Sequence, residues 1–560
     1  MRGIPTIGDV SRQEWRWVAF WGGLLVTLTL IPYAIAIMAA NEQWAFMGVL
    51  ANPQDGATYF AKIEEGMEGN WLYELQHTPQ PHRPAGVFVF YLLLGQLARL
   101  IGTSPFIIFH LARIATSLFM FTAIYRLGAY VWLRTRPRRL FFLIASMVTG
   151  LGWLMLPFIS ENNVPPDIGV PEAFPFYAAY ANPHFPLSIG CLVMLVGIYI
   201  RVFRPDYSQA PTVENGGALV LIYAVILSVV QPPALVAFGA ALVGFTVSTA
   251  YRQRTIPWHE IRWVAMLALA GLPVLVYYVL LFSTNETFRE FNEQNVTPSP
   301  NIIFTIASYG VLLMLAIPAI NRARKRFDRD GDYLMLLWLV INFIVVYVPH
   351  PLQRRFFIGL IIPIVYFVVR ALEDYWFERI SKRWHRIALI AVFIFILPSN
   401  FITLMIPLFG VVANQEQGAQ AGLMLDRDYV DMFAWLDEFG AEDEVVLASP
   451  DVSLWLPAQT PLRVVYGHPY ETVPSGQRED DVLDFFTGRD CNAVFEHAKG
   501  FDIDYLVVGP MEIQLAVEAR TNNPDEDFVD CITTVIQSIE EPQAIQVFGD
   551  VTLYILRDLR

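Results

Sequence analysis

A segment rich in ionisable side chains, residues 52–84, follows the first long apolar run of the chain. It begins near Asp55 and ends near His82 and Arg83. Carboxylates and imidazoles take up protons in catalysis, and a guanidinium group can bind two oxygens of one phosphate. The segment is therefore either an ordinary polar loop or a reactive site, and the elements around it decide which.

Composition places this segment in a membrane protein. The chain has 560 residues, of which 55% are hydrophobic and 16% are charged, well below the roughly 25% charged residues of soluble domains. Several runs exceed the roughly 18 apolar residues that a membrane-spanning helix needs. A net charge of −14 argues against nucleic-acid binding. We expect a polytopic α-helical membrane protein.

Charge distribution predicts the topology. The apolar segments lie at 18–38, 85–101, 105–133, 140–159, 185–203, 216–231, 233–250, 262–282, 301–320, 333–349, 355–370 and 387–410. If 85–101 lies on the outer surface without crossing, most of the 38 Lys and Arg fall in cytoplasmic segments, as the positive-inside rule requires. If it crosses, most basic loops move outside. We therefore predict eleven crossings, a cytoplasmic N-terminus and an extracytoplasmic C-terminus.

The outer loop 41–104 is expected to hold two juxtamembrane helices. An apolar stripe at helical spacing follows Asp55, with charged residues on the opposite face. The stripe is Ala57, Phe60, Ile63 and Met67, and the charged residues are Lys62, Glu64, Glu65 and Glu68. Gly66 or Gly69 ends this helix, and Pro84 suits the first turn of a second helix at 85–101.

The composition changes after residue 414, where a transmembrane domain at 1–414 gives way to a domain at 415–560. Helical stretches are expected at 426–439 and 479–486, and strands at 444–448, 463–466, 505–508 and 551–556. Their alternation predicts a small soluble α/β domain. The polar and aromatic stretch 466–472 is predicted to be a structured loop and not a site. Cys491 and Cys531 can pair if this domain faces an oxidising space.

Two short motifs give the chain a family resemblance. Asp55-Gly56-Ala57-Thr58-Tyr59 is followed by His82-Arg83-Pro84-Ala85-Gly86. This pattern resembles the GT-C membrane glycosyltransferases, in the branch of protein O-mannosyltransferases and lipid A aminoarabinose transferases. The likeness covers the N-terminal third best. It departs from the family at Gly56, which replaces the second acid of the family's Asp-Glu pair.

The resemblance implies a role for Asp55 and for three arginines. Asp55 would take the proton of an acceptor hydroxyl, although an Asp before an amphipathic helix is often only an N-cap. Arg83 would bind the phosphate of the donor, unless it only contacts lipid headgroups. Arg354 and Arg355 lie after Pro349-His350-Pro351 at the outer end of a span and would also meet the phosphate. Snorkelling at a span end is the competing explanation for this pair.

A second outer loop carries further candidates for substrate or metal binding. They are Glu161, Asp167, Glu172 and His184, with His82 from the first loop. Their oxygens suit Mg²⁺ or Mn²⁺, but the spacing does not require a metal, and solvated loop acids are the simpler interpretation. His77 and His82 are lone loop histidines, which seldom join a site.

The leading hypothesis is a glycosyltransferase in the cell membrane. It would transfer a sugar from a polyprenyl-phosphate donor to a hydroxyl of a lipid, glycan or protein at the extracytoplasmic face. The first alternative is a transporter or lipid flippase, which predicts ionisable residues in mid-span and repeated broken helices. The second is a non-catalytic GT-C relative, which the missing acid at Gly56 keeps open.

Overall fold

The computed structural model describes residues 8–160, 163–203, 213–326, 331–498, 500–523, 528–537 and 545–556. Their contacts divide the chain into two compact units. The first, here called the helical unit, comprises Met1–Pro32, His110–Val279 and Val296–Ile406. The second, called the loop–tail unit, comprises Tyr33–Phe109, Leu280–Asn295 and Pro407–Arg560. The outer loop 41–104 and the C-terminal domain 415–560, here called the tail, therefore belong to one compact unit.

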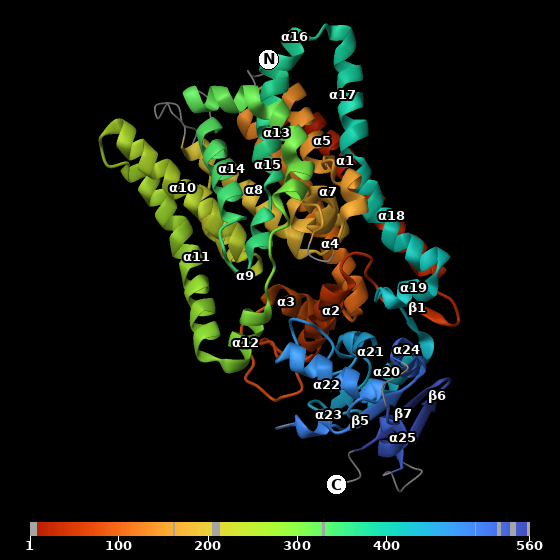
Figure 1. Cartoon of the computed structure of the whole chain (residues 1–560). Helices are drawn as coiled ribbons and strands as arrows, with labels where there is room; N and C mark the ends of the chain where they lie inside the picture. The colour runs from red at the N-terminus through yellow and green to blue at the C-terminus, as the bar shows by residue number, and fades with distance from the viewer. Residues whose placement is uncertain are drawn as a thin grey trace. The chain divides into compact units, whose positions relative to one another are not determined.

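Nine helical segments in the described part of the chain are long and apolar enough to cross a membrane. They are Arg12–Ala39 (α1), Pro105–Val131 (α4), Thr135–Phe158 (α5 and η1), His184–Val202 (α8), Pro232–Gln253 (α10), Trp258–Thr284 (α11), Ile302–Lys325 (α13), Gln353–Arg379 (η4, α15, η5 and α16) and Lys382–Ala413 (α17 and α18) (Figure 1). Two shorter apolar helices are Gly216–Val230 (α9) and Asp332–Val345 (α14). Together these segments coincide with the eleven predicted spans, and the expectation of a mostly helical polytopic chain is confirmed.

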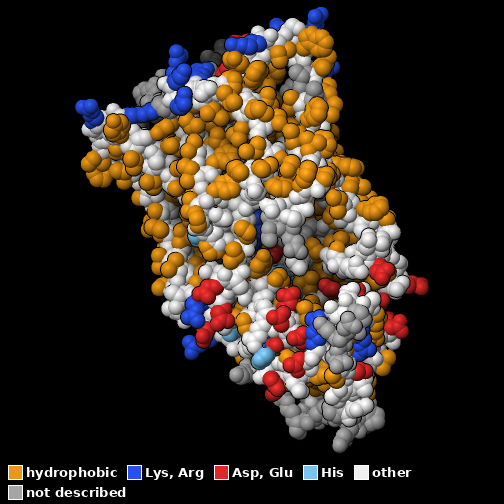
Figure 2. All heavy atoms as spheres, viewed as in Figure 1, with side chains coloured by type: hydrophobic (Ala, Val, Ile, Leu, Met, Phe, Trp, Pro, Cys, Tyr) orange, Lys and Arg blue, Asp and Glu red, His pale blue; other side chains and the backbone are white. Residues whose placement is uncertain are grey.

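Burial separates the helices at the centre of the helical unit from those at its surface. Of the 18 most apolar consecutive residues of α8, 89% are buried. The same share holds for the segment around α15 (Ile361–Ala371). In α11 the share is 17%, which leaves large side chains such as Leu269 and Val279 exposed. Hydrophobic side chains cover much of the visible surface of this unit (Figure 2). Such exposure suits helices surrounded by lipid.

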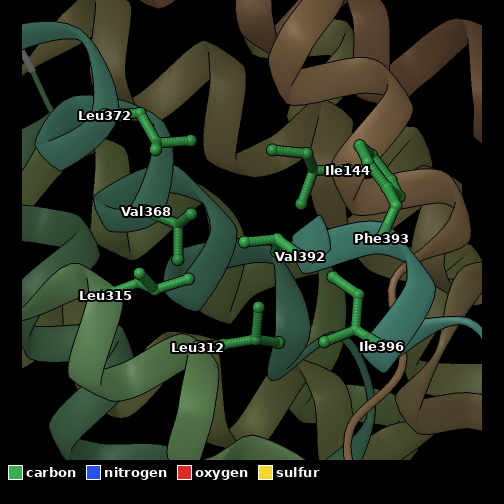
Figure 3. Close-up of a pocket in the computed structure, with 8 residues that line it drawn as sticks. All are labelled: Ile144, Leu312, Leu315, Val368, Leu372, Val392, Phe393 and Ile396. Atoms are coloured by element: carbon green, nitrogen blue, oxygen red, sulfur yellow. The ribbon is translucent and has the colours of Figure 1, made fainter. Parts of the chain in front are cut away.

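The helical unit contains a small apolar cavity between α5 (Thr135–Met147), α13, α15 and α17 (Lys382–Ile396). Its volume is ≈ 20 Å³, and only aliphatic and aromatic side chains line it (Figure 3). These lining residues are Ile144, Leu312, Leu315, Val368, Leu372, Val392, Phe393 and Ile396. Without polar groups to orient a ligand, the cavity is a packing void between helices.

The loop–tail unit begins with the two helices expected in the outer loop. These are α2 (Pro53–Glu68), which Gly69 ends in the left-handed conformation at φ 112°, and α3 (Val89–Ile101). They cross at Gly66 and Gly95, where a Cβ on Gly66 would stand 2.4 Å from the carbonyl oxygen of Leu92. The prediction that the second helix begins at Pro84 is wrong, because Ala85 pairs with Tyr73 as an isolated β-bridge and helix formation waits until residue 89.

Two charged residues of α2 are not on an exposed face. Lys62 and Glu65 are 0% and 3% exposed, whereas Glu68 is exposed. The expected two-faced helix is therefore wrong at these positions. The reason is that α2 packs against α3 on one side and against the tail on another, as shown by the contact between Phe60 and Trp455 at 6.2 Å. A helix enclosed on several sides buries residues of every type.

The tail forms the expected α/β domain. Its five-stranded sheet has the order β4-β3-β5-β7-β6. The strands are Arg463–Val464 (β4), Val445–Leu447 (β3), Tyr505–Val508 (β5), Val551–Ile555 (β7) and Ile545–Phe548 (β6), with β3 parallel to both neighbours and β7 antiparallel to β5 and β6. Helices α20 (Arg427–Phe439) and α22 (Ser475–Thr487) lie where helical stretches were predicted, whereas β6 was not predicted.

Two further connections complete this unit. Strand β1 (Trp44–Phe46) of the outer loop pairs antiparallel with β2 (Met424–Asp426) at the start of the tail. Cys491 and Cys531 form a disulfide across 40 residues of sequence. The sequence left the pairing of these cysteines open, and the structure joins them. The outer loop is hydrogen-bonded to the domain that follows the last span.

Candidate functional site

Asp55 lies in the first turn of α2. Asn52, the residue before the helix, adopts the left-handed conformation at φ 55°, and Pro53 occupies the first helical position. The side-chain amide of Asn52 donates a hydrogen bond to Asp55 Oδ2. Asp55 is therefore not the N-cap that its sequence context suggested. Its side chain remains 18% exposed, and the helix N-terminus favours its negative charge.

Gly56, at which the sequence departs from the motif that it resembles, is closely packed. Gly56 is buried against Val49, and a Cβ on this residue would lie 2.7 Å from Val49 Cγ2. Such a distance forces a neighbouring group to move. Any side chain at this position would therefore require Val49 to move.

His468 of the tail approaches Asp55. Its Nδ1 accepts hydrogen bonds from the backbone amides of Tyr470 at 3.1 Å and Glu471 at 3.2 Å. Its Nε2 lies 3.9 Å from Asp55 Oδ1. Burial lowers the pKa of His468, against the opposing charges of Glu471 and Asp55. A neutral imidazole that accepts at Nδ1 carries its proton on Nε2, so the N–H faces the carboxylate.

A buried ion pair lies further along α2. Lys62 Nζ contacts Glu471 Oε1 at 2.5 Å, and the Tyr73 hydroxyl donates to Glu471 Oε2 at 2.8 Å. Burial raises the pKa of Glu471, but Lys62 and two histidines outweigh it and lower the value to about 2. Burial lowers the pKa of Lys62, and Glu471 opposes this shift. Nζ also lies 4.2 Å from the centre of the Phe88 ring, which attracts a cation.

Further hydrogen bonds hold the loop that carries His468 and Glu471. Thr78 donates to the Glu471 carbonyl at 2.6 Å and accepts from Val473 N at 3.1 Å. Gln294, at the end of α12 (Glu286–Gln294), donates to the carbonyls of Tyr470 at 2.7 Å and Thr472 at 2.6 Å. Thr78 of the outer loop and Gln294 of α12 therefore hold this loop in place, as a structured loop requires. That it is not a site stays a prediction.

His77 stands beside the same group. Its Nε2 lies 3.1 Å from the carbonyl of Leu454, and its ring centre is 5.9 Å from that of His468. Burial lowers the pKa of His77 to about 4. The imidazole is therefore neutral at pH 7. Sequence reasoning discounted His77 as a lone loop histidine and did not select Lys62, His468 or Glu471, because their partners lie about 400 residues away.

His82 and Arg83 lie in the same unit but differ in burial. His82 Nε2 accepts from Leu75 N at 2.9 Å, and its Nδ1 lies 2.9 Å from the carbonyl of Gln80. Both ring nitrogens therefore serve the conformation of their own loop, and burial lowers the pKa of the ring. Arg83 is exposed. Its assignment to a donor phosphate stays a prediction.

The remaining candidates belong to the helical unit. Asp167 is buried and accepts four hydrogen bonds, from Gly150 N at 3.0 Å, Gly152 N at 3.1 Å, Ser308 Oγ at 2.6 Å and Ser399 Oγ at 2.7 Å. Glu172, also buried, lies 3.8 Å from Arg355. The structure thus brings two of the predicted residues together. Glu161 lies outside the described residues.

The other two candidates of this unit have different surroundings. Arg354 is partly buried, and its backbone N–H donates to the carbonyl of Thr297 at 2.9 Å. His184 is buried at the start of α8. Asp55, His82 and Arg83 belong to the other unit, so the expected convergence of all these residues on one cavity stays a prediction.

Asp167 and Glu172, the described acids of the second outer loop, already face other groups. Both oxygens of Asp167 already accept hydrogen bonds, and Glu172 faces a guanidinium. Across the described ranges, no group of three or more His, Cys, Asp or Glu is arranged to hold a metal ion.

Comparison with known proteins found distant structural likenesses. No protein-family model matches the sequence, and no curated protein matches it closely. The oligosaccharyltransferase of Archaeoglobus fulgidus, tethered with an acceptor peptide, is similar at a TM-score of 0.48 and 13% identity, over 88% of this chain and 69% of that one. ArnT from Cupriavidus metallidurans bound to undecaprenyl phosphate is similar at a TM-score of 0.48 and 13% identity, over 96% of this chain and 98% of that one.

Proposed function

We propose that this protein transfers a sugar from a polyprenyl-phosphate donor to an acceptor hydroxyl, with Asp55 as the general base. The observation that carries the proposal is the setting of Asp55. Its carboxylate keeps an exposed surface at a helix N-terminus, although the charged residues two turns along the helix and in the facing loop are buried. A base must reach its substrate, and Asp55 meets this requirement in the segment that carries the family resemblance.

The reaction needs a second function, stabilisation of the phosphate leaving group. Negative charge grows on the phosphate as its bond to the sugar breaks, so a cation held near it lowers the barrier. Arg83, Arg354 and Arg355 are the groups proposed for this role. Arg83 is exposed, and Arg355 is partly neutralised by Glu172 at 3.8 Å. The reaction is proposed to occur at the extracytoplasmic face, with the N-terminus in the cytoplasm.

The test uses the full-length protein in detergent with a panel of ¹⁴C-labelled undecaprenyl-phosphate hexoses and pentoses. A total membrane extract from the expression host supplies lipid, glycan and protein acceptors. The wild-type protein should label one acceptor fraction, and Asp55→Asn should lower that transfer by at least about 100-fold, the scale of general base catalysis. Glu68→Gln, an exposed acid at the other end of α2, is the matched control and should keep full activity.

The outcomes separate the hypotheses. Full activity in Asp55→Asn would reject this residue as the base. A wild-type protein that binds the labelled donors but transfers none of them would support the non-catalytic alternative. Movement of the intact lipid between leaflets of a vesicle, without sugar transfer, would support the flippase.

A further inference from the structure

A gap between two polar groups remains beside Asp55. Nε2 of His468 is buried and makes no hydrogen bond to any described residue, and Asp55 Oδ1 lies 3.9 Å away from it. We propose that Asp55 and His468 together bind the acceptor hydroxyl, the carboxylate receiving its proton and Nε2–H donating to its oxygen. This proposal rests on the proposed function and adds His468 as a catalytic residue that contacts the substrate.

The direction of the imidazole supports this assignment. Two backbone amides, those of Tyr470 and Glu471, donate to Nδ1. They hold the ring in one orientation and in one tautomer. A buried N–H without an acceptor costs about 1–3 kcal/mol, so an imidazole held this way is arranged for a partner that arrives from outside.

The distance fits one oxygen atom. At 3.9 Å, Nε2 and Oδ1 are too far apart for a direct hydrogen bond, which needs about 3.2 Å or less. An oxygen about 2.8 Å from both atoms would hold them at an angle of about 90°, within the range that a hydroxyl group accepts. His468 is 3% exposed and Asp55 is 18% exposed, so a substrate hydroxyl would have to enter the gap from the side of Asp55.

The charges around the gap keep His468 in its donor form. The charged and titratable groups that act on it are Asp55 and Lys62 from α2, His77 from the outer loop and Glu471 from its own loop. Lys62 and Glu471 neutralise each other at 2.5 Å. His77 is neutral because burial lowers its pKa to about 4. Asp55 is therefore the negative group toward which the N–H of His468 points.

The pair formed by Asp55 and His468, here called the clamp, determines which atoms react. The acceptor O–H proton passes to Asp55 as the oxygen forms a bond to the anomeric carbon of the sugar. The bond from that carbon to the donor phosphate breaks, and its electron pair leaves with the phosphate. With its proton directed to Asp55 and one lone pair directed to His468, the oxygen attacks with its other lone pair. Orientation of this kind contributes strongly to catalysis.

The clamp also selects the chemical class of the acceptor. A hydroxyl oxygen has two lone pairs and can accept from His468 while it attacks. An amine has a single lone pair, and an amide nitrogen has none available. His468 therefore favours hydroxyl acceptors over nitrogen acceptors.

Two substitutions test the clamp against a purely structural role. His468→Asn places an amide oxygen near the position of Nδ1, so it holds the loop but removes the donor toward Asp55. His468→Gln places an amide N–H near the position of Nε2, so it keeps the donor but loses the acceptor for the loop amides. Both full-length proteins are assayed with the donor and acceptor fraction that the wild-type protein uses, and their thermal unfolding is recorded.

The clamp predicts that His468→Asn is the more stable but the less active of the two variants. His468→Asn should keep the wild-type unfolding temperature and lose about 10–100-fold in kcat/KM for the acceptor, with the KM for the donor unchanged. His468→Gln should unfold at a lower temperature but stay within about fivefold of wild-type activity. Wild-type activity in His468→Asn, or a loss in His468→Gln as large as in His468→Asn, would overturn the clamp. In either case an inactive Asp55→Asn would leave the proposed function standing.

Discussion

At the scale of single residues, burial sets the protonation of the acids on α2. Glu65 is 3% exposed, and its Oε1 accepts from Glu74 N at 2.9 Å. Burial, with the added repulsion of Glu74 and Glu68, raises its pKa to about 9. Burial also raises the pKa of Glu64 to about 7. The helix that carries the proposed base therefore holds carboxyl groups in two protonation states at neutral pH.

Glu65 makes a pH-dependent contribution to stability. A carboxyl whose pKa is 4.5 in the unfolded chain and about 9 in the folded protein binds more protons when folded between these values. The contribution of Glu65 to folding stability is therefore largest below pH 4.5 and falls as the pH rises toward 9. Glu65→Gln removes this dependence while its amide oxygen keeps the bond to Glu74 N. Relative to wild type, it should gain about 2 kcal/mol between pH 5 and pH 8, below the limit of about 1.4 kcal/mol per pKa unit.

Thermal unfolding of the two proteins at pH 5, 6, 7 and 8 measures this gain. The difference in stability between Glu65→Gln and the wild-type protein should grow as the pH rises. A constant difference across the four values would show that Glu65 is ionised in the folded protein.

At the scale of elements, α2 and α3 approach each other through a pair of glycines. A Cβ on Gly95 would lie 2.1 Å from the carbonyl of Ile63, and one on Gly66 would lie 2.4 Å from the carbonyl of Leu92. Both obstacles are backbone atoms, which cannot move aside as a side chain can. Tyr59 and Tyr91 stack across the same interface at 4.3 Å. This close crossing orients α2, the helix on which Asp55 and Lys62 lie.

Gly66→Ala should therefore destabilise the loop–tail unit by about 1–3 kcal/mol, as overpacking does in well-packed cores. It should also lower transfer activity, because α2 must shift. Gly476→Ala is the matched control, since a Cβ at this helical position in α22 meets nothing within 4 Å. The control should be neutral or stabilising by up to about 1 kcal/mol. Equal unfolding temperatures for the two variants would contradict the tight crossing.

At the scale of the whole molecule, the tail is joined to the outer loop by side-chain contacts and by strand pairing. The Lys62–Glu471 ion pair and the β1–β2 ladder connect residues that are far apart in sequence. The Cys491–Cys531 disulfide lies within the tail. A disulfide persists in an oxidising space. The extracytoplasmic location of the tail stays a prediction from the positive-inside rule.

This topology predicts which cysteines a membrane-impermeant reagent can reach from outside the cell. In intact cells, a membrane-impermeant phosphine followed by an impermeant maleimide should label Cys491 and Cys531. Without the phosphine, which leaves Cys491 and Cys531 paired, the Arg254→Cys variant should react only after lysis, because this loop is predicted to be cytoplasmic. Buried Cys191 serves as the unreactive control. Labelling of the Arg254 variant in intact cells would invert the proposed orientation.

Reduction should also destabilise the tail. The disulfide closes a loop across 40 residues, and its loss should cost about 2–4 kcal/mol by the usual scale for such crosslinks.

The sequence by itself determined the features that depend on local pattern. Apolar runs located the spans because a helix must be continuously apolar to cross lipid. Alternating strand and helix signals located the α/β tail, and the helix that begins near Asp55 followed from its 3.6-residue period. The later start of α3 and the burial of Lys62 and Glu65 did not follow, because a single helical stripe assumes one packing face and α2 has several.

Tertiary structure alone decided the composition of the candidate site. His468 and Glu471 reach α2 from a loop some 400 residues later, and local sequence carries no signal for such a contact. The protonation of Glu65, His77 and His468 is set by burial, which arises only when the outer loop and the tail pack together. Periodicity thus located the helix, the motif resemblance pointed to Asp55 within it, and the fold supplied the charged and hydrogen-bonded neighbours of this residue.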